Sequence, residues 1–217
     1  MIKIIIKFVL ISILFCKLAY GEKINIFEFT DIELQSLEVR KVRGSDNKTE
    51  YSLGSNENGN YLKAVADNAA SGLGKKLIID LNTTPFINIT WKVEKDLKGI
   101  NEKSKKGHDF AARLFVIKKT GATALSNRAI NYVFSSNNNI GDNWPSPFTK
   151  KSIDNVLSTT KEHYNQWVTV KANVKEDFKK FHDLDVNELN GIAIMADTDN
   201  SKTKSISYYQ NIYFSAD

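Results

Sequence analysis

Cysteine is almost absent from this sequence of 217 residues, in which Cys16 is the single example. Because Cys16 falls within the first 21 residues, a chain that loses this segment has no disulfide, no cysteine nucleophile and no thiolate metal site. The sequence also lacks a nucleophile elbow, an HExxH pair, a glycine-rich phosphate loop and a CxxC pair. The common catalytic and metal-binding motifs are therefore excluded, although a Ser-His-Asp triad assembled by the fold stays open.

The first 21 residues have the composition of a secretory signal peptide. Lys3 and Lys7 give a positive start, an apolar run occupies 8–16, and Ala19 and Gly21 are the small residues that precede a cleavage site. We therefore expect a cleaved leader at 1–21 and a single β-sandwich domain at 22–217, located in a bacterial periplasm or secreted.

Two other interpretations of this leader have less support. A membrane anchor would need about 20 apolar residues, whereas this run is short and Lys17 interrupts it. A lipoprotein would place a small residue before Cys16, but Phe15 stands there. We expect no stable membrane span after cleavage.

Charge gives little support to a nucleic-acid partner. The whole chain carries a net charge of +5, and loss of three leader lysines without any acid lowers it to +2. The remaining lysines are scattered along the chain rather than clustered, so we expect no nucleic-acid binding.

Apolar residues in the remaining chain mostly alternate with polar ones, which is the pattern of β-strands. The clearest segments are 86–93, 108–117 and 129–135, while 191–196 is apolar on both faces and suits a central strand. Trp91 and Trp167 are both expected in the core. The residues predicted to lie buried between two sheets are Ile89, Trp91, Phe110, Ala112, Leu114, Ile192 and Ile194.

One short helix is predicted after residue 173. Asn173 can cap it, Glu176 stands at the third helical position, and Val174, Phe178 and Phe181 share a face. Many short strands with one helix indicate an all-β fold, a two-sheet β-sandwich of jelly-roll type. A closed barrel is the alternative, but the loops are long and uneven.

Polar residues on the predicted strands form the first candidate ligand site. Asp109 and Arg113 are four residues apart, so they point to the same side of a strand at about 13 Å from one another. Asn131 lies opposite the apolar side chains of the next strong strand and could join their surface. Solvated charges that pair with neighbouring strands would give the same pattern.

The segment 197–200 follows the predicted central strand and supplies Asp197, Asp199 and Asn200. Two acids and an amide could bind Ca²⁺, although the spacing is not that of an EF-hand. Asp and Asn are equally favoured in turns for backbone reasons. No other cofactor is indicated.

Trp144 is the last candidate, because it stands in a loop rich in glycine and proline. Such a ring could stack on a sugar, or it could pack the loop against the domain.

Several segments in order resemble the bacterial family DUF3047. They include Asp-Phe-Ala-Ala-Arg at 109–113 and Asp-Thr-Asp-Asn at 197–200, and the sequence departs from the family pattern at His108 and Phe134. The resemblance implies an exported protein without an assigned activity, with a fold similar to galactose-binding-like jelly rolls of carbohydrate-binding modules. The segments that carry it are 48–51, 61–64, 70–73, 91–93, 109–113, 129–133 and 197–200.

By analogy of fold, we expect non-catalytic binding of a carbohydrate or a similar polar ligand. One alternative is an envelope-polysaccharide hydrolase or lyase that uses Asp109, Arg113 and 197–200. Another is a structural or protein-interaction domain of the cell envelope. An aromatic-lined groove would favour binding, carboxylates with shifted pKa values in a cleft would favour an enzyme, and an exposed apolar patch would favour an interaction domain.

The leader gives the first testable prediction. Protein recovered from the cell envelope should begin at Glu22, because the small residues Ala19 and Gly21 define the cleavage site. Intact-mass spectrometry measures this directly. A diacylated species that begins at Cys16 would show a lipoprotein instead.

Overall fold

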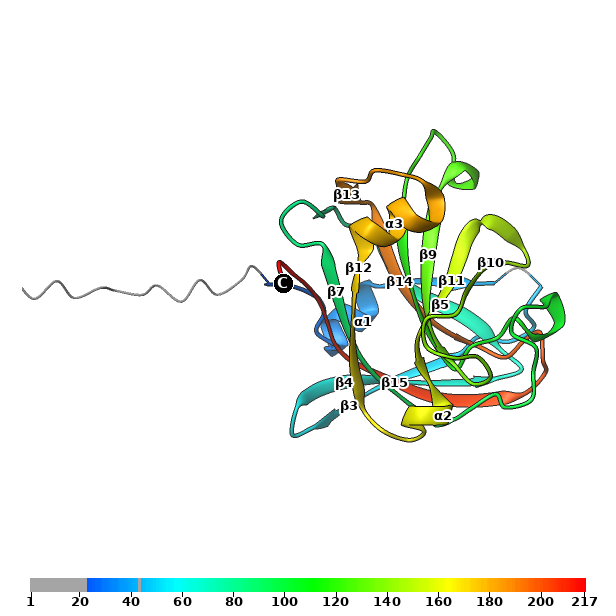
Figure 1. The fold of residues 1–217 in the computed structure, drawn as a ribbon. Coiled ribbons are helices and arrows are strands. Elements are labelled where there is room, and N and C mark those ends of the chain that lie inside the picture. Colours follow the sequence, from blue (N-terminus) through cyan, green and yellow to red (C-terminus); the bar gives the residue numbers. More distant parts are fainter. Residues whose placement is uncertain (1–22, 43) are drawn as a thin grey trace, which may run out of the picture.

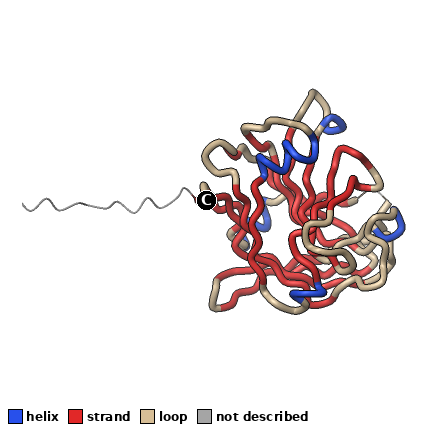
Figure 2. Tube along the Cα trace, viewed as in Figure 1, coloured by secondary structure: helices blue, strands red, loops and turns tan. Residues whose placement is uncertain are grey.

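The computed structural model describes residues 23–42 and 44–217. The predicted signal peptide, with its cleavage after Gly21, lies outside these residues. Strands make up most of the described chain, and the helices are short and lie at its periphery (Figure 2). The all-β class predicted from the period-two pattern is confirmed.

Six strands form the first sheet: β1 (Lys23–Phe27), β3 (Glu50–Asn56), β4 (Gly59–Asp67), β7 (Phe86–Lys95), β12 (Val168–Asn173) and β15 (Lys204–Ser215). Their order is β12-β7-β15-β4-β3, and β1 pairs with β15 outside this path. All of these pairs are antiparallel. The long strands β7 and β15 form the middle of the sheet (Figure 1).

Seven strands form the second sheet: β2 (Glu38–Lys41), β5 (Ala70–Lys75), β8 (Ala112–Lys118), β9 (Arg128–Ser135), β10 (Asn143–Ser146), β11 (Thr149–Thr159) and β14 (Gly191–Asp197). Their order is β10-β11-β9-β8-β14-β5-β2, and the pair β9–β11 is parallel. The apolar strand β14 lies between β8 and β5, as its two apolar faces predicted. Two short strands, β6 (Ile79–Asp80) and β13 (Glu188–Leu189), form a separate pair.

Short helices lie at the ends of the sheets. The predicted helix is α3 (Val174–His182), and the side chain of its cap Asn173 accepts a hydrogen bond from the Glu176 N–H at 3.2 Å. None of the described helices has the length and apolar character needed to cross a membrane. The pattern did not predict the remaining helical elements, which are α1 (Asp31–Ser36), α2 (Thr160–His163) and the 3₁₀ turns η1 (Lys105–Gly107) and η2 (Ala124–Ser126).

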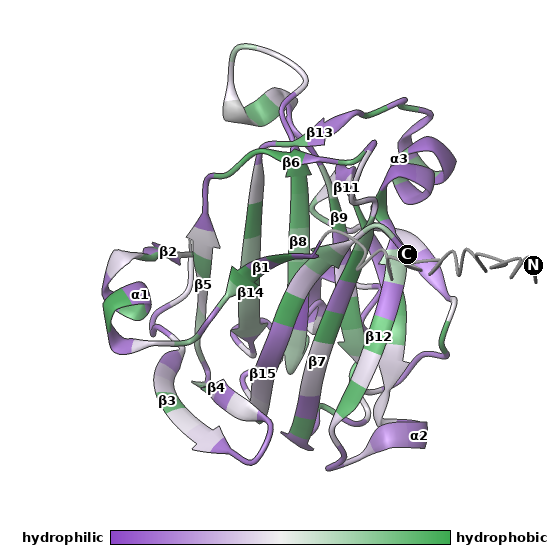
Figure 3. Ribbon diagram, turned by 90° about the vertical axis from the view of Figure 1, so that its left-hand side faces the viewer, coloured by the Kyte–Doolittle hydropathy of each residue, from purple (hydrophilic) through white to green (hydrophobic). Residues whose placement is uncertain are grey.

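The two sheets pack face to face around one large apolar core. Figure 3 shows the underlying alternation as hydrophilic and hydrophobic bands along β7 and β15. The polar atoms of buried aromatic side chains form hydrogen bonds with residues of the opposite sheet, because buried polar groups need partners. The indole N–H of Trp91 donates to Ser158 Oγ at 2.9 Å, and the Tyr209 hydroxyl donates to the Met195 carbonyl at 2.6 Å. The two-sheet sandwich is confirmed, and the closed barrel is not what forms.

Six of the seven predicted core residues lie in this core, and Phe110 does not. Phe110 is buried in a second cluster with Val133, Trp144 and Val156. The period-two pattern fails there because β8 begins only at Ala112, and residues 108–111 follow an irregular path. This break places Ala111 in the main core and turns Phe110 to the other side.

Trp167 also departs from the prediction. Trp91 is fully buried, but Trp167 is half-buried on the outer side of the six-stranded sheet. Val168 pairs with Trp91, so the preceding residue lies beside the outward-facing Lys92. The one-residue offset decides which side of the sheet each tryptophan occupies.

The core register can be tested at Leu114, which is 0% exposed and belongs to the main core. Leu114→Asp should lower the free energy of unfolding by at least about 4 kcal/mol, because the carboxylate would be buried without a partner. Leu125→Asp is a matched control at an 83% exposed leucine. Urea unfolding measures both, and an equal effect of the two substitutions would refute the assigned register.

Candidate functional site

Arg113 forms a buried ion pair on the outer side of the seven-stranded sheet. Its Nη2 lies 2.5 Å from Asp197 Oδ2, and its side chain is only 6% exposed. The guanidinium carbon lies 5.4 Å from the Phe110 ring centre and 5.1 Å from the Phe115 ring centre. The pair thus joins the second residue of β8 to the last residue of β14 between two aromatic rings.

Asp109 holds the turn that follows β14. Its Oδ1 accepts hydrogen bonds from the Asn200 amide side chain at 2.9 Å and the Asn200 backbone N–H at 3.2 Å. Its Oδ2 accepts from the Ser201 N–H at 2.6 Å. Because Asp109 is 0% exposed, these bonds compensate for the burial of its carboxylate.

Three carboxylates gather at this point. One oxygen from each of Asp109, Asp197 and Asp199 lies within 4.8 Å of the others. Burial raises the pKa of Asp197 well above its ordinary value, the Arg113 guanidinium opposes this, and the charge of Asp109 adds to it. Burial and then the charge of Asp109 raise the pKa of Asp199. We call Asp109, Arg113, Asp197, Asp199 and Asn200 the acidic cluster.

The acidic cluster is a poor fit for Ca²⁺. This ion takes about 6–8 oxygen ligands, but the two oxygens of Asp197 already accept from Arg113 and from the Phe110 N–H. Both oxygens of Asp109 are taken by the turn 200–201. The Arg113 guanidinium already supplies a positive charge beside these carboxylates. An ion would have to displace these donors before it could bind.

Asn131 belongs to a neighbouring buried network rather than to the acidic cluster. Its amide donates to Asp154 Oδ1 at 2.6 Å, and His108 Nε2 lies 2.7 Å from Asp154 Oδ2. Asn131 pairs with Phe115 across β9 and β8, two residues away from the position opposite Arg113. It shares a sheet face with Arg113, yet no hydrogen bond joins the two among the described residues.

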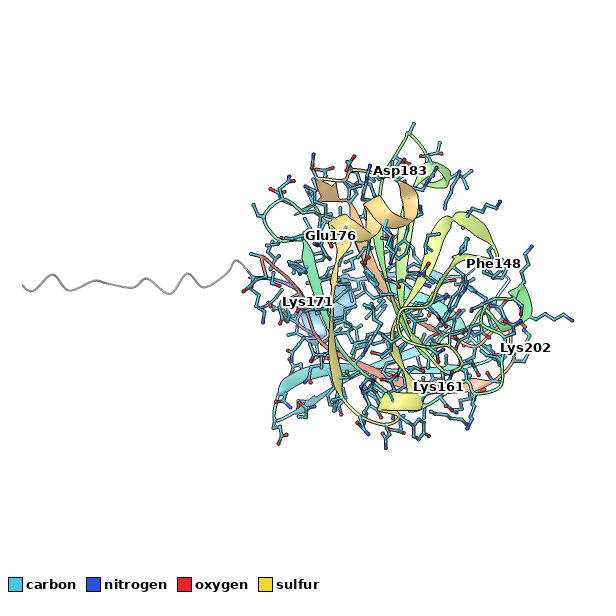
Figure 4. The ribbon with its side chains drawn as sticks, viewed as in Figure 1. Phe148, Lys161, Lys171, Glu176, Asp183 and Lys202 are labelled. Carbon is cyan, nitrogen blue, oxygen red and sulfur yellow. The ribbon has the colours of Figure 1, made fainter. Side chains whose placement is uncertain are left out.

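Trp144 anchors its loop and does not present an open ring. It is 8% exposed and packs with Phe110, Val133 and Val156. Lys103 Nζ lies 4.9 Å from its ring centre. Figure 4 labels Phe148, whose ring stands 5.5 Å from that of His108 close to the same loop. Trp144 is therefore packed into the domain, whereas Phe148 beside it is 57% exposed.

The structure also contains polar residues that sequence reasoning missed. Asp154 is 0% exposed and joins His108 to Asn131. Glu102 is 1% exposed and accepts from the Ser136 N–H at 2.7 Å and the Asn138 amide at 2.6 Å, which fixes the loop 98–107. Glu102 is the one acid in the lysine-rich segment 98–107, and its partners lie in a run of asparagines. This was the sequence signal that could have identified Glu102.

An open groove lies on the same outer side of the seven-stranded sheet, over β2, β5, β14 and the end of β8. We call it the outer groove; its volume is about 420 Å³. None of the seven predicted ligand residues lines it. The residues that line it are Glu38, Arg40, Gly74, Lys75, Lys76, Ile117, Lys119, Gly121, Ala122, Thr123, Asn127, Asn190, Gly191, Ile192 and Ala193.

The floor of the outer groove consists of small residues on adjacent strands. A Cβ placed on Gly74 would lie 3.6 Å from that of Ala193, so the two positions face the same side. Gly191 lies in the same way beside Ile117. Gly74 pairs with Ala193 across the two strands, and Gly191 precedes Ala193 by two residues, so this spacing of small residues was the sequence signal for the floor.

Comparison with known proteins defines the class of the chain. A family model described as "Protein of unknown function (DUF3047)" matches residues 35–213. The chain therefore belongs to this family, which confirms the resemblance seen in its motifs. No curated protein matches the sequence.

The solved structures that resemble this chain include three at 9–10% identity. The glycoside hydrolase domain of Endo-D from Streptococcus pneumoniae R6 is 9% identical with a TM-score of 0.41. This match covers 83% of the present chain but only 22% of the Endo-D chain. A thermostable cellulase derived from Cel12A of Rhodothermus marinus is 10% identical with a TM-score of 0.43, over 88% and 98% of the two chains. The xyloglucanase domain of NopAA from Sinorhizobium fredii, in complex with cellobiose, is 10% identical with a TM-score of 0.42, over 77% and 92%. Scores of this size decide nothing about ligand or activity.

The buried ion pair gives a stability prediction. Arg113→Met should destabilise the protein by about 3 kcal/mol, because it leaves the buried Asp197 carboxylate without its cation. Arg40→Met is the control, since Arg40 pairs with Glu38 at the surface and should matter little. Thermal and urea unfolding measure both variants.

A double variant makes this test specific. Asp197→Asn keeps an acceptor for the Phe110 N–H, so Arg113→Met combined with Asp197→Asn should be more stable than Arg113→Met alone. Strictly additive losses would contradict an energetic coupling between the two residues.

Proposed function

We propose that the chain is exported to the bacterial periplasm and there binds a carbohydrate or a similar polar ligand without transforming it. The observation that carries the proposal is the outer groove. Its volume of about 420 Å³ falls within the range of about 300–1,000 Å³ that is usual for small-ligand sites. The leader at 1–21 supports the location.

The lining of the outer groove suits a ligand rich in hydroxyl or carboxylate groups. No aromatic residue is among the residues that line it, so a ligand would be held by hydrogen bonds and charge rather than by stacking. Arg40, Lys76 and Lys119 supply cationic donors around the small-residue floor. Asn127 Oδ1 is a buried acceptor without a hydrogen bond within the described chain. A donor on a ligand or water could satisfy it.

The alternative of an envelope-polysaccharide hydrolase draws on one observation. The acidic cluster holds three close carboxylates, two of them with raised pKa values, and glycosidases use such pairs. However, Asp109 and Asp197 are at most 1% exposed and their oxygens accept bonds from protein donors. A substrate could reach only Asp199 without rearrangement. Binding is therefore the better-supported function.

Filling the outer groove should abolish ligand binding. Ala193→Phe projects a ring from the floor, and Gly74→Leu projects a branched aliphatic side chain from the next strand, where a Cβ meets only ordinary contacts. Isothermal titration against neutral and acidic oligosaccharides should show binding by the wild type and a loss of at least about tenfold in both variants, because the filled volume excludes the ligand.

Ile78→Phe is the control, since it adds a similar ring at a 73% exposed position outside the groove. It should bind as the wild type does. Undiminished binding by Ala193→Phe and Gly74→Leu, with unchanged melting temperatures, would refute the groove as the site. Release of new reducing ends by the wild type, lost in Asp197→Asn, would favour the hydrolase instead.

A further inference from the structure

The outer side of the six-stranded sheet carries a second polar and aromatic surface that the outer groove does not involve. In Figure 3 the strands β7, β12 and β15 lie toward the viewer, and α2 and α3 are at the ends of these strands. The surface lies across β4, β15 and β7 and the residue before β12. We call it the cationic aromatic face, and its members are Tyr61, Lys63, Lys92, Trp167 and Tyr208.

Strand register places cations and rings alternately in a row. Tyr208 of β15 pairs with Lys63 of β4 on one side and with Lys92 of β7 on the other. Trp167 continues the row beyond Lys92, because Val168 pairs with Trp91. Lys92 Nζ lies 4.4 Å from the Tyr208 ring centre and 5.7 Å from that of Trp167. Lysine side chains laid against rings keep their ammonium groups near the aromatic surface.

The three rings form a compact triangle. Their centres are 6.0 Å apart for Tyr61–Trp167, 5.6 Å for Tyr61–Tyr208 and 5.9 Å for Trp167–Tyr208. Tyr61 lies over Gly54 of β3, where any Cβ would collide with its ring. The missing side chain of Gly54 therefore leaves the space that the Tyr61 ring occupies, and the half-buried rings of Tyr61 and Trp167 remain accessible from solvent.

Polar atoms of this face are left without partners. Neither Lys63 nor Lys92 forms an ion pair with a residue that the structure describes. The carboxylate of Glu94, which lies on the same side, accepts from the Tyr208 hydroxyl at 2.6 Å. The Tyr61 hydroxyl and the Trp167 indole N–H make no hydrogen bond with any residue in 23–42 or 44–217. Two cations, a hydroxyl and an indole donor thus surround the half-buried rings of Tyr61 and Trp167.

We propose that the cationic aromatic face binds a negatively charged sugar residue, such as a uronic acid unit of an acidic polysaccharide. The C–H face of the sugar ring packs on Trp167, its edge contacts Tyr61, whose ring is tilted by 55° from that of Trp167, and its carboxylate lies between Lys63 and Lys92. The two lysines flank Tyr208 from the next strand on either side, which sets them about 10 Å apart along the sheet at their Cα atoms. Flexible side chains can converge from this distance on one carboxylate.

A membrane surface is the other partner that lysines and aromatics together could suit. It is disfavoured because little of each ring projects into solvent: Tyr208 is 8% exposed, and Trp167 and Tyr61 are half-buried. The proposal is independent of the outer groove, since that groove is on the other sheet.

Polygalacturonate and hydroxyethylcellulose are the probes, as an acidic and an uncharged polymer, with phosphatidylglycerol vesicles as a third. The mature protein should bind polygalacturonate in affinity electrophoresis. Trp167→Ala and Tyr61→Ala should each weaken this binding by at least about tenfold, because each removes a stacking surface. Tyr164→Ala is the matched control at a 51% exposed tyrosine outside the face, and it should change nothing.

Charge and folding are checked separately. Lys63→Gln with Lys92→Gln should weaken binding of polygalacturonate while leaving the rings and the melting temperature unchanged, so this variant tests the proposal even if a ring variant misfolds. The proposal is overturned if the lysine and ring variants bind polygalacturonate like the wild type, if the wild type binds only vesicles, or if it binds neither polymer. Loss in Ala193→Phe alone would support the outer groove and overturn the cationic aromatic face.

Discussion

The buried pair of Arg113 and Asp197 is the constraint on which the outer side of the seven-stranded sheet depends. Its two charges are almost completely removed from water, so each would be costly without the other. The pair fixes the start of β8 against the end of β14, where the Arg113 N–H also donates to the Tyr209 hydroxyl of the opposite sheet at 2.9 Å. Asp109 then binds the turn after β14 through the Ser201 N–H. These three contacts together connect two strands, a turn and both sheets, so the acidic cluster is best understood as a structural element.

A sandwich has two outer sides, and in this molecule they differ in chemistry. The seven-stranded sheet offers a hollow with a floor of glycine and alanine, where a ligand can approach the backbone closely. The six-stranded sheet offers three rings with lysines on the adjacent strands. The dense core between the sheets separates these surfaces, so each can be altered without repacking the other. Two separate contacts on one polymer would raise its apparent affinity beyond that of either alone.

Alternation of side chains was sufficient to predict β7 and β9, because these strands have a regular backbone. A continuous apolar run predicted β14, and a cap followed by an apolar helix face predicted α3. It failed at residues 108–111, where an irregular path reverses the sides of Ala111 and Phe110 without any change in composition. The hydrolase alternative grouped Asp109 and Arg113 with 197–200, and the structure brings these residues together. The sequence did not predict that their polar atoms bond to one another, since this depends on register between distant strands. The outer groove was not predicted, because the small residues of its floor carry no functional group that would mark a binding site, although their spacing is regular. Trp167 shows that a shift of one residue along a strand turns a core residue into a surface one.

The central claim is that ligands contact the open surfaces of the sandwich and not the buried acidic cluster. Amide chemical-shift mapping of the mature protein during titration with oligogalacturonate tests this most directly. The account predicts saturable shifts at floor residues of the outer groove, such as Gly74, Gly191 and Ala193, and at Trp167 and Tyr61 of the cationic aromatic face. Shifts confined to Asp109, Asp197 and Asp199 would contradict it and return the acidic cluster to consideration as the functional site.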